Sequence, residues 1–313
     1  YITSWSVKMS FLVLGASGML GHQVCRTISC CVTPKRIYGT LSPYRYDNQK
    51  HINKIKQLSP CSDFIRFDAF CDDVSILFKG NPKVIVNCIG LINQSPTYKL
   101  ADKDYIYAIN AEFPHKLAHE AKKRGVRVVH ISTDCVFSGN KGLYSEYDTP
   151  DSDTIYGMSK AQGEPLEYNN VLVLRTSFYG PEIFYKGSLF EWVKSQKGKT
   201  INGYADCIFN GSSTTWVSML ISDICVKNQG LTGLYHFGIF PYSKYFLLKT
   251  INWAFDLGIT IVKDKKVKSN KALFCEKLMV DMPDAIRYIY ATAVQTVEHM
   301  KYMYRKKLEA YNL

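Results

Sequence analysis

A short apolar run, a glycine-rich turn and an amphipathic helical pattern follow one another in "SFLVLGASGMLGHQVCRTI", residues 10–28. A buried strand that feeds a helix through a glycine turn is a βα unit. Further strand-like runs, with helical patterns between several of them, lie at 36–41, 63–68, 84–90, 127–133, 171–177 and 233–238. This alternation predicts an α/β fold built on a parallel sheet that is covered on both faces.

The predicted fold is a doubly wound parallel-sheet Rossmann-type domain with a smaller C-terminal substrate lobe. The regular rhythm loosens after residue 178, where helices are expected at 188–196, at 213–228, from 241 and from 283. The last of these could exceed about 25 residues and is expected to pack on the lobe, with a homodimer contact as the alternative. The expected division is 9–177 with about 213–238 for the NAD(P)-binding domain, 178–212 with 239–313 for the lobe, and 1–8 as an extension ahead of Met9.

The net charge of +12, from 39 basic and 27 acidic residues, raises the question of an anionic partner. Basic clusters occur at 122–127, 263–268 and 304–308, but the other basic residues are scattered. A solvated surface, or attraction for an anionic small molecule such as a diphosphate, explains this pattern better than nucleic acid does. We therefore expect no nucleic-acid partner.

No apolar run approaches the roughly 18 residues that a membrane span needs, and the N-terminal stretch lacks a signal-peptide pattern. We expect a cytoplasmic protein without membrane insertion. The ten cysteines include no CxxC pair and no Cys/His spacing suited to zinc. They are therefore predicted to be reduced and structural, and no metal site is expected.

The glycine turn carries the first functional prediction. Gly15, Gly18 and Gly21 form G-x-x-G-x-x-G between a strand and a helix. Glycines let the backbone turn tightly and approach a pyrophosphate, whose charge is stabilised by free N–H groups and the helix dipole. A purely structural turn is the alternative, but the strand-turn-helix context favours a dinucleotide cofactor.

The end of the second strand favours NADP(H) over NAD(H). An acidic residue usually lies about 20 residues past the loop in NAD-binding proteins, where it binds the ribose hydroxyls. This sequence has Thr40, Ser42 and Arg45 in that region instead, and an arginine can pair with a 2′-phosphate. Asp47 keeps NAD(H) possible, and Asp68 is expected either to accept a hydrogen bond from adenine or to cap a helix.

Tyr156 and Lys160 lie four residues apart in "TIYGMSKAQGE", residues 154–164, so on a helix they share one face. A phenol titrates near pKa 10, and a nearby ammonium favours the phenolate. We expect the lysine, the nicotinamide cation and partial desolvation together to move the pKa of Tyr156 towards neutrality. Ser132 and Thr133 end the preceding strand and can place a hydroxyl beside the Tyr156 oxygen.

Taken together, these patterns resemble the extended short-chain dehydrogenase/reductase superfamily, and more closely its dTDP-4-dehydrorhamnose reductase branch. The resemblance covers about 170 residues in order and continues more weakly at 201–224 and 233–251. Cys135 stands where the family has an aromatic residue, and 93–104 departs from the family's acidic run. The matching segments are "GASGMLG" (15–21), "VNCIG" (86–90), "INAEFPHKLA" (109–118), "STDCVFSG" (132–139), "YSEYDTPDSDTIYGMSKAQGE" (144–164) and "LRTSFYGPE" (174–182).

The resemblance implies a role for each matching residue. Tyr156 would protonate a substrate carbonyl oxygen, Lys160 would bind the nicotinamide ribose and tune the tyrosine, and Thr133 would hydrogen-bond the same oxygen. Asn110 would brace the backbone near the site or simply cap a helix. The expected cofactor-binding residues are Gly15, Ser17, Gly18, Met19, Leu20, Gly21, Thr40, Arg45, Asp68, Cys88, Ile89, Gly90, Tyr156, Lys160 and Phe178. The expected substrate-binding residues are Asn93, Gln94, Asp134, Asn210, Gly211 and Thr215.

The implied activity is NADPH-dependent reduction of a nucleotide-diphosphate 4-keto-6-deoxy sugar, in rhamnose-type precursor synthesis. An epimerase or dehydratase of the same superfamily is one alternative. Dehydration usually needs an acidic pair near the "STD" segment, where this chain has Asp134 followed by Cys135. A non-catalytic NADP-binding regulatory subunit, as in the beta subunit of methionine adenosyltransferase, is the other.

Overall fold

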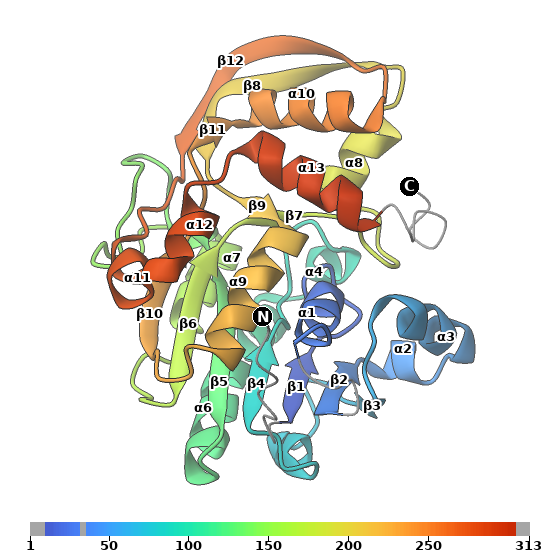
Figure 1. Ribbon diagram of the computed structural model, residues 1–313, viewed down its shortest axis with the longest axis vertical. Helices are drawn as coiled ribbons and strands as arrows, with labels where there is room; N and C mark the ends of the chain where they lie inside the picture. The colour runs from blue at the N-terminus through green and yellow to red at the C-terminus, as the bar shows by residue number, and fades with distance from the viewer. Residues whose placement is uncertain (1–9, 32–35, 305–313) are drawn as a thin grey trace, which may run out of the picture.

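Seven parallel strands form the central sheet in the computed structural model (Figure 1). The structure describes residues 10–31 and 36–304, so the expected extension at 1–8 lies outside the described residues. The strand order is β10-β6-β5-β4-β1-β2-β3, and neighbouring strands pair in parallel. The predicted α/β doubly wound sheet is confirmed. Its strands are β1 (Phe11–Leu14), β2 (Ile37–Leu41), β3 (Asp63–Arg66), β4 (Val84–Asn87), β5 (Arg127–Thr133), β6 (Val171–Thr176) and β10 (Gly233–Phe237).

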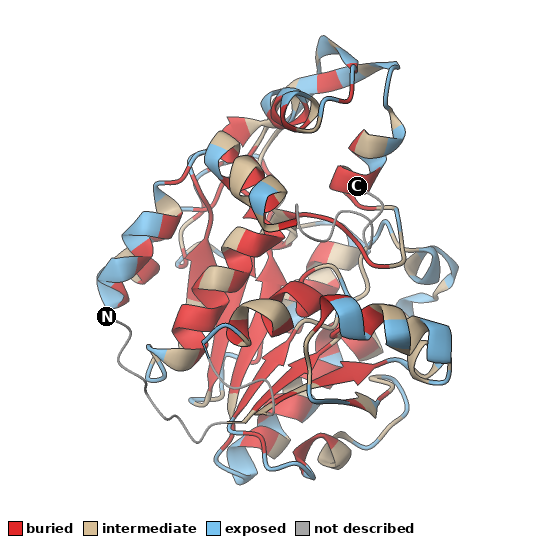
Figure 2. Ribbon diagram, turned by 45° about the vertical axis from the view of Figure 1, so that its right-hand side comes forward, coloured by how far each residue is buried: buried red, intermediate tan, exposed pale blue. Residues whose placement is uncertain are grey.

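Side chains alternate along the buried strands between two cores, one on each face of the sheet. In β1, Phe11 and Val13 belong to one core, whereas Leu12 and Leu14 belong to the other. This explains why the strands read as continuous apolar runs, and Figure 2 shows them buried along their length. The first face is covered by α1 (Gly21–Ile28), α3 (Gln49–Leu58) and α9 (Thr214–Val226), and the second by α6 (Phe113–Lys123).

The remaining helices of the first half are short. α7 (Ile155–Gln162) packs against β5 and carries the predicted Tyr-Lys pair. α2 (Pro43–Tyr46), α4 (Pro96–Leu100) and α5 (Lys103–Tyr107) follow the carboxyl ends of β2 and β4, where the sequence patterns gave no helix. Each of these three has only four or five residues, which is too short for a visible apolar periodicity.

A second, three-stranded sheet of order β11-β8-β12 forms the lobe above the carboxyl ends of the central strands (Figure 1). Its strands are β8 (Thr200–Phe209), β11 (Tyr242–Ser243) and β12 (Thr260–Asn270), and α10 (Lys244–Phe255) packs on β8. Neither β8 nor β12 was predicted. β12 is an exposed edge strand that carries several lysines and shows no apolar alternation. α8 (Leu189–Ser195) and the short parallel pair of β7 (Phe178–Tyr179) and β9 (Ser212–Ser213) lie between the lobe and the central sheet.

The C-terminal stretch is broken, so the prediction of one long helix is wrong. After α11 (Glu276–Asp281), a 3₁₀ turn at Pro283–Ala285 leads into α12 (Ile286–Ile289), and α13 (Ala293–Tyr304) begins anew. Thr292 ends the break because its hydroxyl accepts a hydrogen bond from the backbone N–H of Gln295 (3.3 Å), as a helix cap does.

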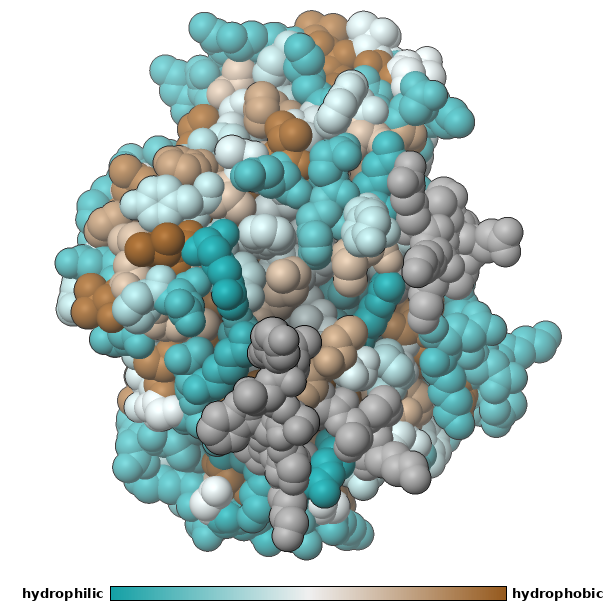
Figure 3. Space-filling model, in the orientation of Figure 1, coloured by the Kyte–Doolittle hydropathy of each residue, from teal (hydrophilic) through white to brown (hydrophobic). Residues whose placement is uncertain are grey.

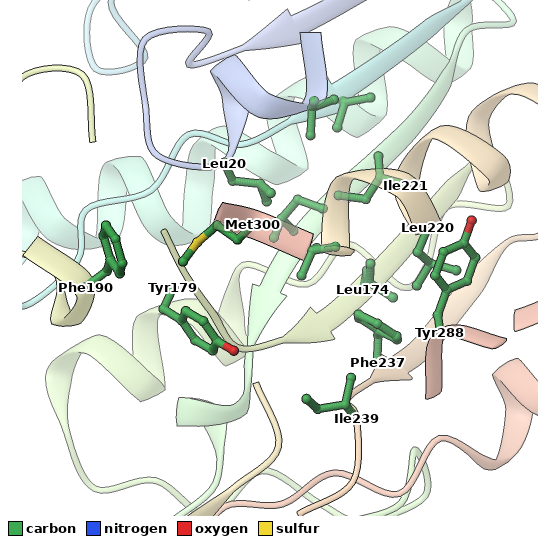
Figure 4. Close-up of a cluster of buried hydrophobic side chains, with 14 of the residues drawn as sticks. Leu20, Leu174, Tyr179, Phe190, Leu220, Ile221, Phe237, Ile239, Tyr288 and Met300 are labelled. Carbon is green, nitrogen blue, oxygen red and sulfur yellow. The ribbon is translucent and has the colours of Figure 1, made fainter. Parts of the chain in front are cut away.

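α13 packs within the chain at the junction between sheet and lobe. Its Val297, Met300 and Tyr304 are fully buried, and Figure 4 shows Met300 among side chains of the central sheet, α8 and α9. The Tyr304 hydroxyl also donates to Gln23 Oε1 in α1 (2.9 Å). On the surface drawn in Figure 3, hydrophobic residues stand in separate groups among hydrophilic ones. The homodimer therefore stays a prediction.

Candidate active site

A cavity of about 570 Å³ opens at the carboxyl ends of the central strands and extends beneath β8. Doubly wound sheets bind ligands at this edge, because the connections diverge there. The cavity brings together residues that the sequence placed on separate segments. Those of the predicted set that line it are Met19, Leu20, Cys88, Ile89, Gly90, Asn93, Gln94, Thr133, Asp134, Tyr156, Lys160 and Phe178.

The glycine turn adopts the tight geometry that its sequence predicts. Gly15 has a φ of +73°, and the Gly18 amide donates to its carbonyl oxygen (2.9 Å). A Cβ at Gly21 would lie 2.1 Å from the same oxygen, so only glycine fits there. Thr40 is buried, and its hydroxyl accepts a hydrogen bond from the Gly15 amide (3.0 Å). Thr40 therefore braces the turn from behind.

The part of the glycine turn that borders the cavity suits an anionic group. α1 begins at Gly21 with no acidic residue in its first turn, and Met19 and Leu20 just before it line the cavity. The helix dipole and the amides of its first turn favour a diphosphate at this place. Farther along, Gly90 lines the cavity beside Lys160, where a Cβ would lie in ordinary contact with Lys160 Nζ (3.8 Å). These features fit a dinucleotide that lies across the strand ends.

Arg45 is held by aromatic rings. Its guanidinium carbon lies 3.8 Å from the centre of the Phe184 ring and 5.1 Å from that of Tyr44. Partial burial lowers the pKa of Arg45, and no acidic side chain of the described residues lies within 4.0 Å to form an ion pair with it. Asp47, by contrast, pairs with Arg66 (3.3 Å). Among the described residues, the basic side chain just after β2 has no acidic ion-pair partner, whereas the acidic one has a basic partner.

Asp68 lies at a turn just after β3. Its Oδ1 accepts a hydrogen bond from the Phe70 amide (2.9 Å), and its own backbone carbonyl accepts one from the Asp72 amide (3.0 Å). These hydrogen bonds show that Asp68 stabilises the turn that follows β3. A contact with adenine stays a prediction.

The two hydroxyls predicted to share a carbonyl oxygen meet in the cavity. Thr154 caps α7 by accepting a hydrogen bond from the Gly157 amide (3.0 Å), and the helix then directs Tyr156 towards the end of β5. There Thr133 and Tyr156 both line the cavity, and hydrogen bonding from Thr133 counters part of the rise in the Tyr156 pKa. A substrate carbonyl beside them would meet the Tyr156 O–H. The Thr133 O–H donates to Asp134 Oδ1 in this structure (3.2 Å), and it would reach the same carbonyl after turning away from that carboxylate.

The expected lowering of the Tyr156 pKa is not observed. Burial raises its pKa well above the usual range, and Cys135 and Asp134 add to the rise. Desolvation disfavours the charged form of a phenol, so the burial that was expected to favour the phenolate opposes it. Tyr156 is therefore firmly protonated, which is the state that a proton donor needs.

Lys160 is buried, with 4% of its surface exposed, and its Nζ donates to the backbone oxygen of Ile131 (2.9 Å). Burial lowers its pKa from 10.5 to about 8. The ammonium is thus anchored to the end of β5, close to both Gly90 and the cavity.

Asn110 braces the loop that follows β4. It lies in a π-helical turn, Ala108–Glu112, so it is not the N-cap that one prediction allowed. Its side chain accepts a hydrogen bond from the Leu91 amide (2.8 Å) and donates to the Leu91 oxygen (3.0 Å) and to Ser159 Oγ (3.2 Å). This ties the cofactor-side loop to α7.

A buried ion pair fixes α7 against the sheet from the other side. Glu164 accepts hydrogen bonds from Arg175 Nε (2.8 Å) and Nη2 (2.6 Å), and Ser132 Oγ donates to the same carboxylate (2.6 Å). Glu164 follows α7, Arg175 lies in β6 and Ser132 immediately precedes Thr133. The pair therefore sets the position of the Tyr156 helix relative to Thr133.

The cavity thiols are not nucleophiles. Cys88, Cys135 and Cys207 line it, and burial raises the pKa of each, to about 12 for Cys135. At neutral pH all three remain protonated. All ten cysteines are free, as expected, although Cys30, Cys31 and Cys71 are exposed rather than packed in the interior.

Three of the predicted substrate residues do not line the cavity. Asn210 pairs with the backbone of Leu273 through both its amide nitrogen (2.7 Å) and its oxygen (2.9 Å). Gly211 lies directly against the Ser177 backbone, and the Thr215 hydroxyl bonds with Ser213 (2.9 Å). These contacts give the three residues structural roles, and their contact with substrate stays a prediction.

The lobe contributes cavity residues that the sequence reasoning missed, above all Lys244 and Lys271. Both lie near Asp134, whose pKa is raised by burial and lowered by these two lysines. Lys271 lies just beyond the basic cluster "KDKKVK" (263–268), and no motif surrounds Lys244. Trp192 of α8 was missed for the same reason.

No helix among residues 10–31 and 36–304 has both the length and the apolar character required to cross a membrane. Within the same ranges, no group of three or more His, Cys, Asp or Glu side chains is arranged to hold a metal ion. The cytoplasmic location remains a prediction.

The family comparison decides among the Rossmann-type possibilities. Residues 9–239 match the model of the RmlD substrate binding domain family. The chain belongs to this family. The predicted resemblance to the dTDP-4-dehydrorhamnose reductase branch of the extended short-chain dehydrogenases/reductases is thereby confirmed.

Individual relatives agree with the family. A dTDP-4-dehydrorhamnose reductase from Aggregatibacter actinomycetemcomitans is 27% identical over 71% of this chain and 76% of its own length. The spore coat polysaccharide biosynthesis protein SpsK of Bacillus subtilis is 32% identical over 54% of the chain, and the match spans about half (53%) of that relative. Among solved structures, a dTDP-4-dehydrorhamnose reductase from Bacillus anthracis in complex with NADP has a TM-score of 0.70 at 22% identity, covering 95% of this chain and 99% of that one.

Proposed function

We propose that this RmlD-family protein is an NADPH-dependent reductase of a nucleotide-diphosphate 4-keto-6-deoxy sugar, acting in rhamnose-type precursor synthesis. The observation that carries the proposal is that Tyr156 and Thr133 line one cavity, which Met19 and Leu20 of the glycine turn also border. Lys160 stands one helical turn from Tyr156 in the same cavity. The named activity of the Aggregatibacter relative supports the same reaction.

The residues of the chain divide the work of carbonyl reduction. The bound nicotinamide supplies the hydride. Tyr156, protonated because burial raises its pKa, gives its proton to the substrate oxygen. The Thr133 hydroxyl turns from Asp134, to which it donates in this structure, and donates a hydrogen bond to that oxygen. Both groups act where negative charge develops in the transition state. The Lys160 ammonium binds ribose hydroxyls and offsets the phenolate that Tyr156 leaves behind.

Arg45 supports NADPH as the reductant. Its guanidinium is stacked through its face on Phe184, so the N–H groups along its edge remain available to a 2′-phosphate. The acid that could bind ribose hydroxyls instead, Asp47, is engaged by Arg66. The NADP named for the Bacillus anthracis structure is consistent with this preference.

The alternatives receive less support from the cavity. A dehydratase needs a second acid near the tyrosine, yet Asp134 is the sole carboxylate among the described residues that line the cavity. A non-catalytic regulatory subunit would not need a tyrosine and a lysine converging on one carbonyl position. Reduction therefore remains the function that the site supports best.

Turnover of NADPH with dTDP- and UDP-linked 4-keto-6-deoxy sugars tests the proposal. Consumption of NADPH, followed through its absorbance, is expected with the wild type and should be almost lost in Tyr156→Phe. The variant should still bind NADPH, because the phenol oxygen is removed without changing the glycine turn. An inactive wild type across both nucleotide series, or an active Tyr156→Phe, would contradict the proposal.

A further inference from the structure

Two lysines from separate parts of the lobe line the cavity above the reacting end. Lys244 is the first residue of α10, and Lys271 directly follows β12. Their neighbours in the chain, Ser243 and Asn270, are both register partners of Ile208, one from each side of β8. The sheet therefore places the two lysines on opposite sides of the same point of β8.

The aliphatic part of the Lys271 side chain packs closely against Gly139. The Lys271 backbone N–H donates to the Ile208 oxygen (2.9 Å), and its Cγ lies 3.1 Å from where a Cβ on Gly139 would be. Gly139 has a φ of +92°, which favours glycine, and its lack of a side chain leaves room for the Lys271 stem. Lys271 is half-buried, unlike the freely exposed Lys265, Lys266 and Lys268 of the neighbouring strand. A solvated surface lysine needs no such fit.

The charges around the two lysines are unbalanced. Three ammonium groups line the cavity, those of Lys160, Lys244 and Lys271, against the carboxylate of Asp134. Within the described ranges, no acidic side chain lies within 4.0 Å of either lobe lysine to form an ion pair. The charges of both lysines lower the pKa of Asp134, but its Oδ1 already accepts a hydrogen bond from the Thr133 hydroxyl (3.2 Å). One carboxylate cannot neutralise this set.

We propose that Lys244 and Lys271 bind the diphosphate of a nucleoside-diphosphate substrate, so that they set its affinity while Tyr156 and Thr133 act on its sugar. This rests on the proposed function for the sugar half of the ligand. In the proposed function the cofactor's own diphosphate takes a different place in the cavity, at the start of α1 next to Met19 and Leu20. Two lysines on either side of β8 suit a group that carries charge on two linked phosphates.

Isothermal titration of the protein saturated with NADP⁺ tests this, because the cofactor site is then filled. The ligands are UDP, dTDP, uridine and thymidine. The wild type should bind the diphosphates much more tightly than the nucleosides. Lys244→Gln and Lys271→Gln should each lose about tenfold in diphosphate affinity, since a hydrogen bond to a charged group contributes about that much, and should leave nucleoside affinity unchanged.

Matched controls come from the same two elements. Lys249→Gln on α10 and Lys268→Gln on β12 remove exposed lysines that do not line the cavity, so they should change affinity little. Lys271→Arg should retain most of the diphosphate affinity because the charge stays in place. With the keto-sugar substrate, the cavity variants should raise KM and keep kcat.

The proposal is overturned if the Lys→Gln cavity variants bind UDP and dTDP as tightly as the wild type. It is equally overturned if the control variants weaken binding as much, or if the wild type binds a diphosphate no better than its nucleoside. A protein with lysine-dependent diphosphate binding but no NADPH turnover would uphold this inference while refuting the proposed reaction. Turnover that is indifferent to both lysines would do the reverse.

Discussion

Replacing Lys160 with methionine should make the cofactor-free protein more stable and inactive. Lys160 is 4% exposed, and burial lowers its pKa from 10.5 to about 8. A fall of about 2.5, at about 1.4 kcal/mol for each pH unit, means that folding a charged Lys160 costs about 3 kcal/mol. Methionine has a similar length and no charge, so it avoids that cost.

The expected gain depends on pH in a defined direction. Below pH 8 the lysine is charged in both the folded and the unfolded chain, so the folded state bears the whole cost. Between pH 8 and 10.5 the folded protein loses the proton before the unfolded chain does, and the cost shrinks. Above that window both forms are neutral, and the advantage of Lys160→Met should have disappeared.

One contact works against the gain. Lys160 Nζ donates to the Ile131 oxygen (2.9 Å), and losing this hydrogen bond should cost about 1 kcal/mol. The net increase in the free energy of unfolding is therefore about 2 kcal/mol near pH 7. Urea denaturation of wild type and Lys160→Met across pH 6 to about 10, with exposed Lys249→Met as the control, measures it. A variant that is less stable than wild type at pH 7, or whose advantage grows with pH, would refute the reasoning.

Three further changes test other parts of the site. Glu164→Gln should lower the free energy of unfolding by about 3–5 kcal/mol in urea denaturation, because it leaves buried Arg175 without its charge partner. As a control, Glu120→Gln breaks an exposed pair with Arg124 and should cost less than about 1 kcal/mol. Equal effects of the two changes would contradict the role assigned to Glu164. Arg45→Ala should weaken NADPH binding by about tenfold in a fluorescence titration and leave NADH binding almost unchanged, and a parallel loss of both would remove Arg45 from 2′-phosphate recognition. Gly21→Ala places a Cβ 2.1 Å from the Gly15 oxygen and should abolish binding of both cofactors, so normal titration curves would show that the turn can shift.

The sequence predicted the central sheet and the reacting residues because both depend on local patterns. Strands buried on two faces read as unbroken apolar runs, and each predicted run became a strand of the sheet within a few residues. Thr133 ends one such strand, and Tyr156 and Lys160 lie on the helix that a capped turn begins. Their convergence follows from the parallel topology, in which the carboxyl ends of all strands share one edge.

The lobe and its contribution to the cavity could not be predicted in this way. β12 is an exposed edge strand with charged side chains, so it lacks the alternation that marks a half-buried strand. Lys244 and Lys271 border one cavity because β11 and β12 flank β8, a pairing between segments far apart in the chain. The stacking of Arg45 on Phe184 likewise joins residues 139 positions apart, which no local pattern records.

Transfer of deuterium from NADPH labelled at the hydride position to a nucleotide-linked 4-keto-6-deoxy sugar tests the central claim most directly. If Tyr156 protonates the oxygen while hydride reaches its carbon, each product molecule should carry one deuterium at C4 and one NADP⁺ should form with it. Sugar that is altered without net formation of NADP⁺, or that gains no deuterium from the cofactor, would contradict the account.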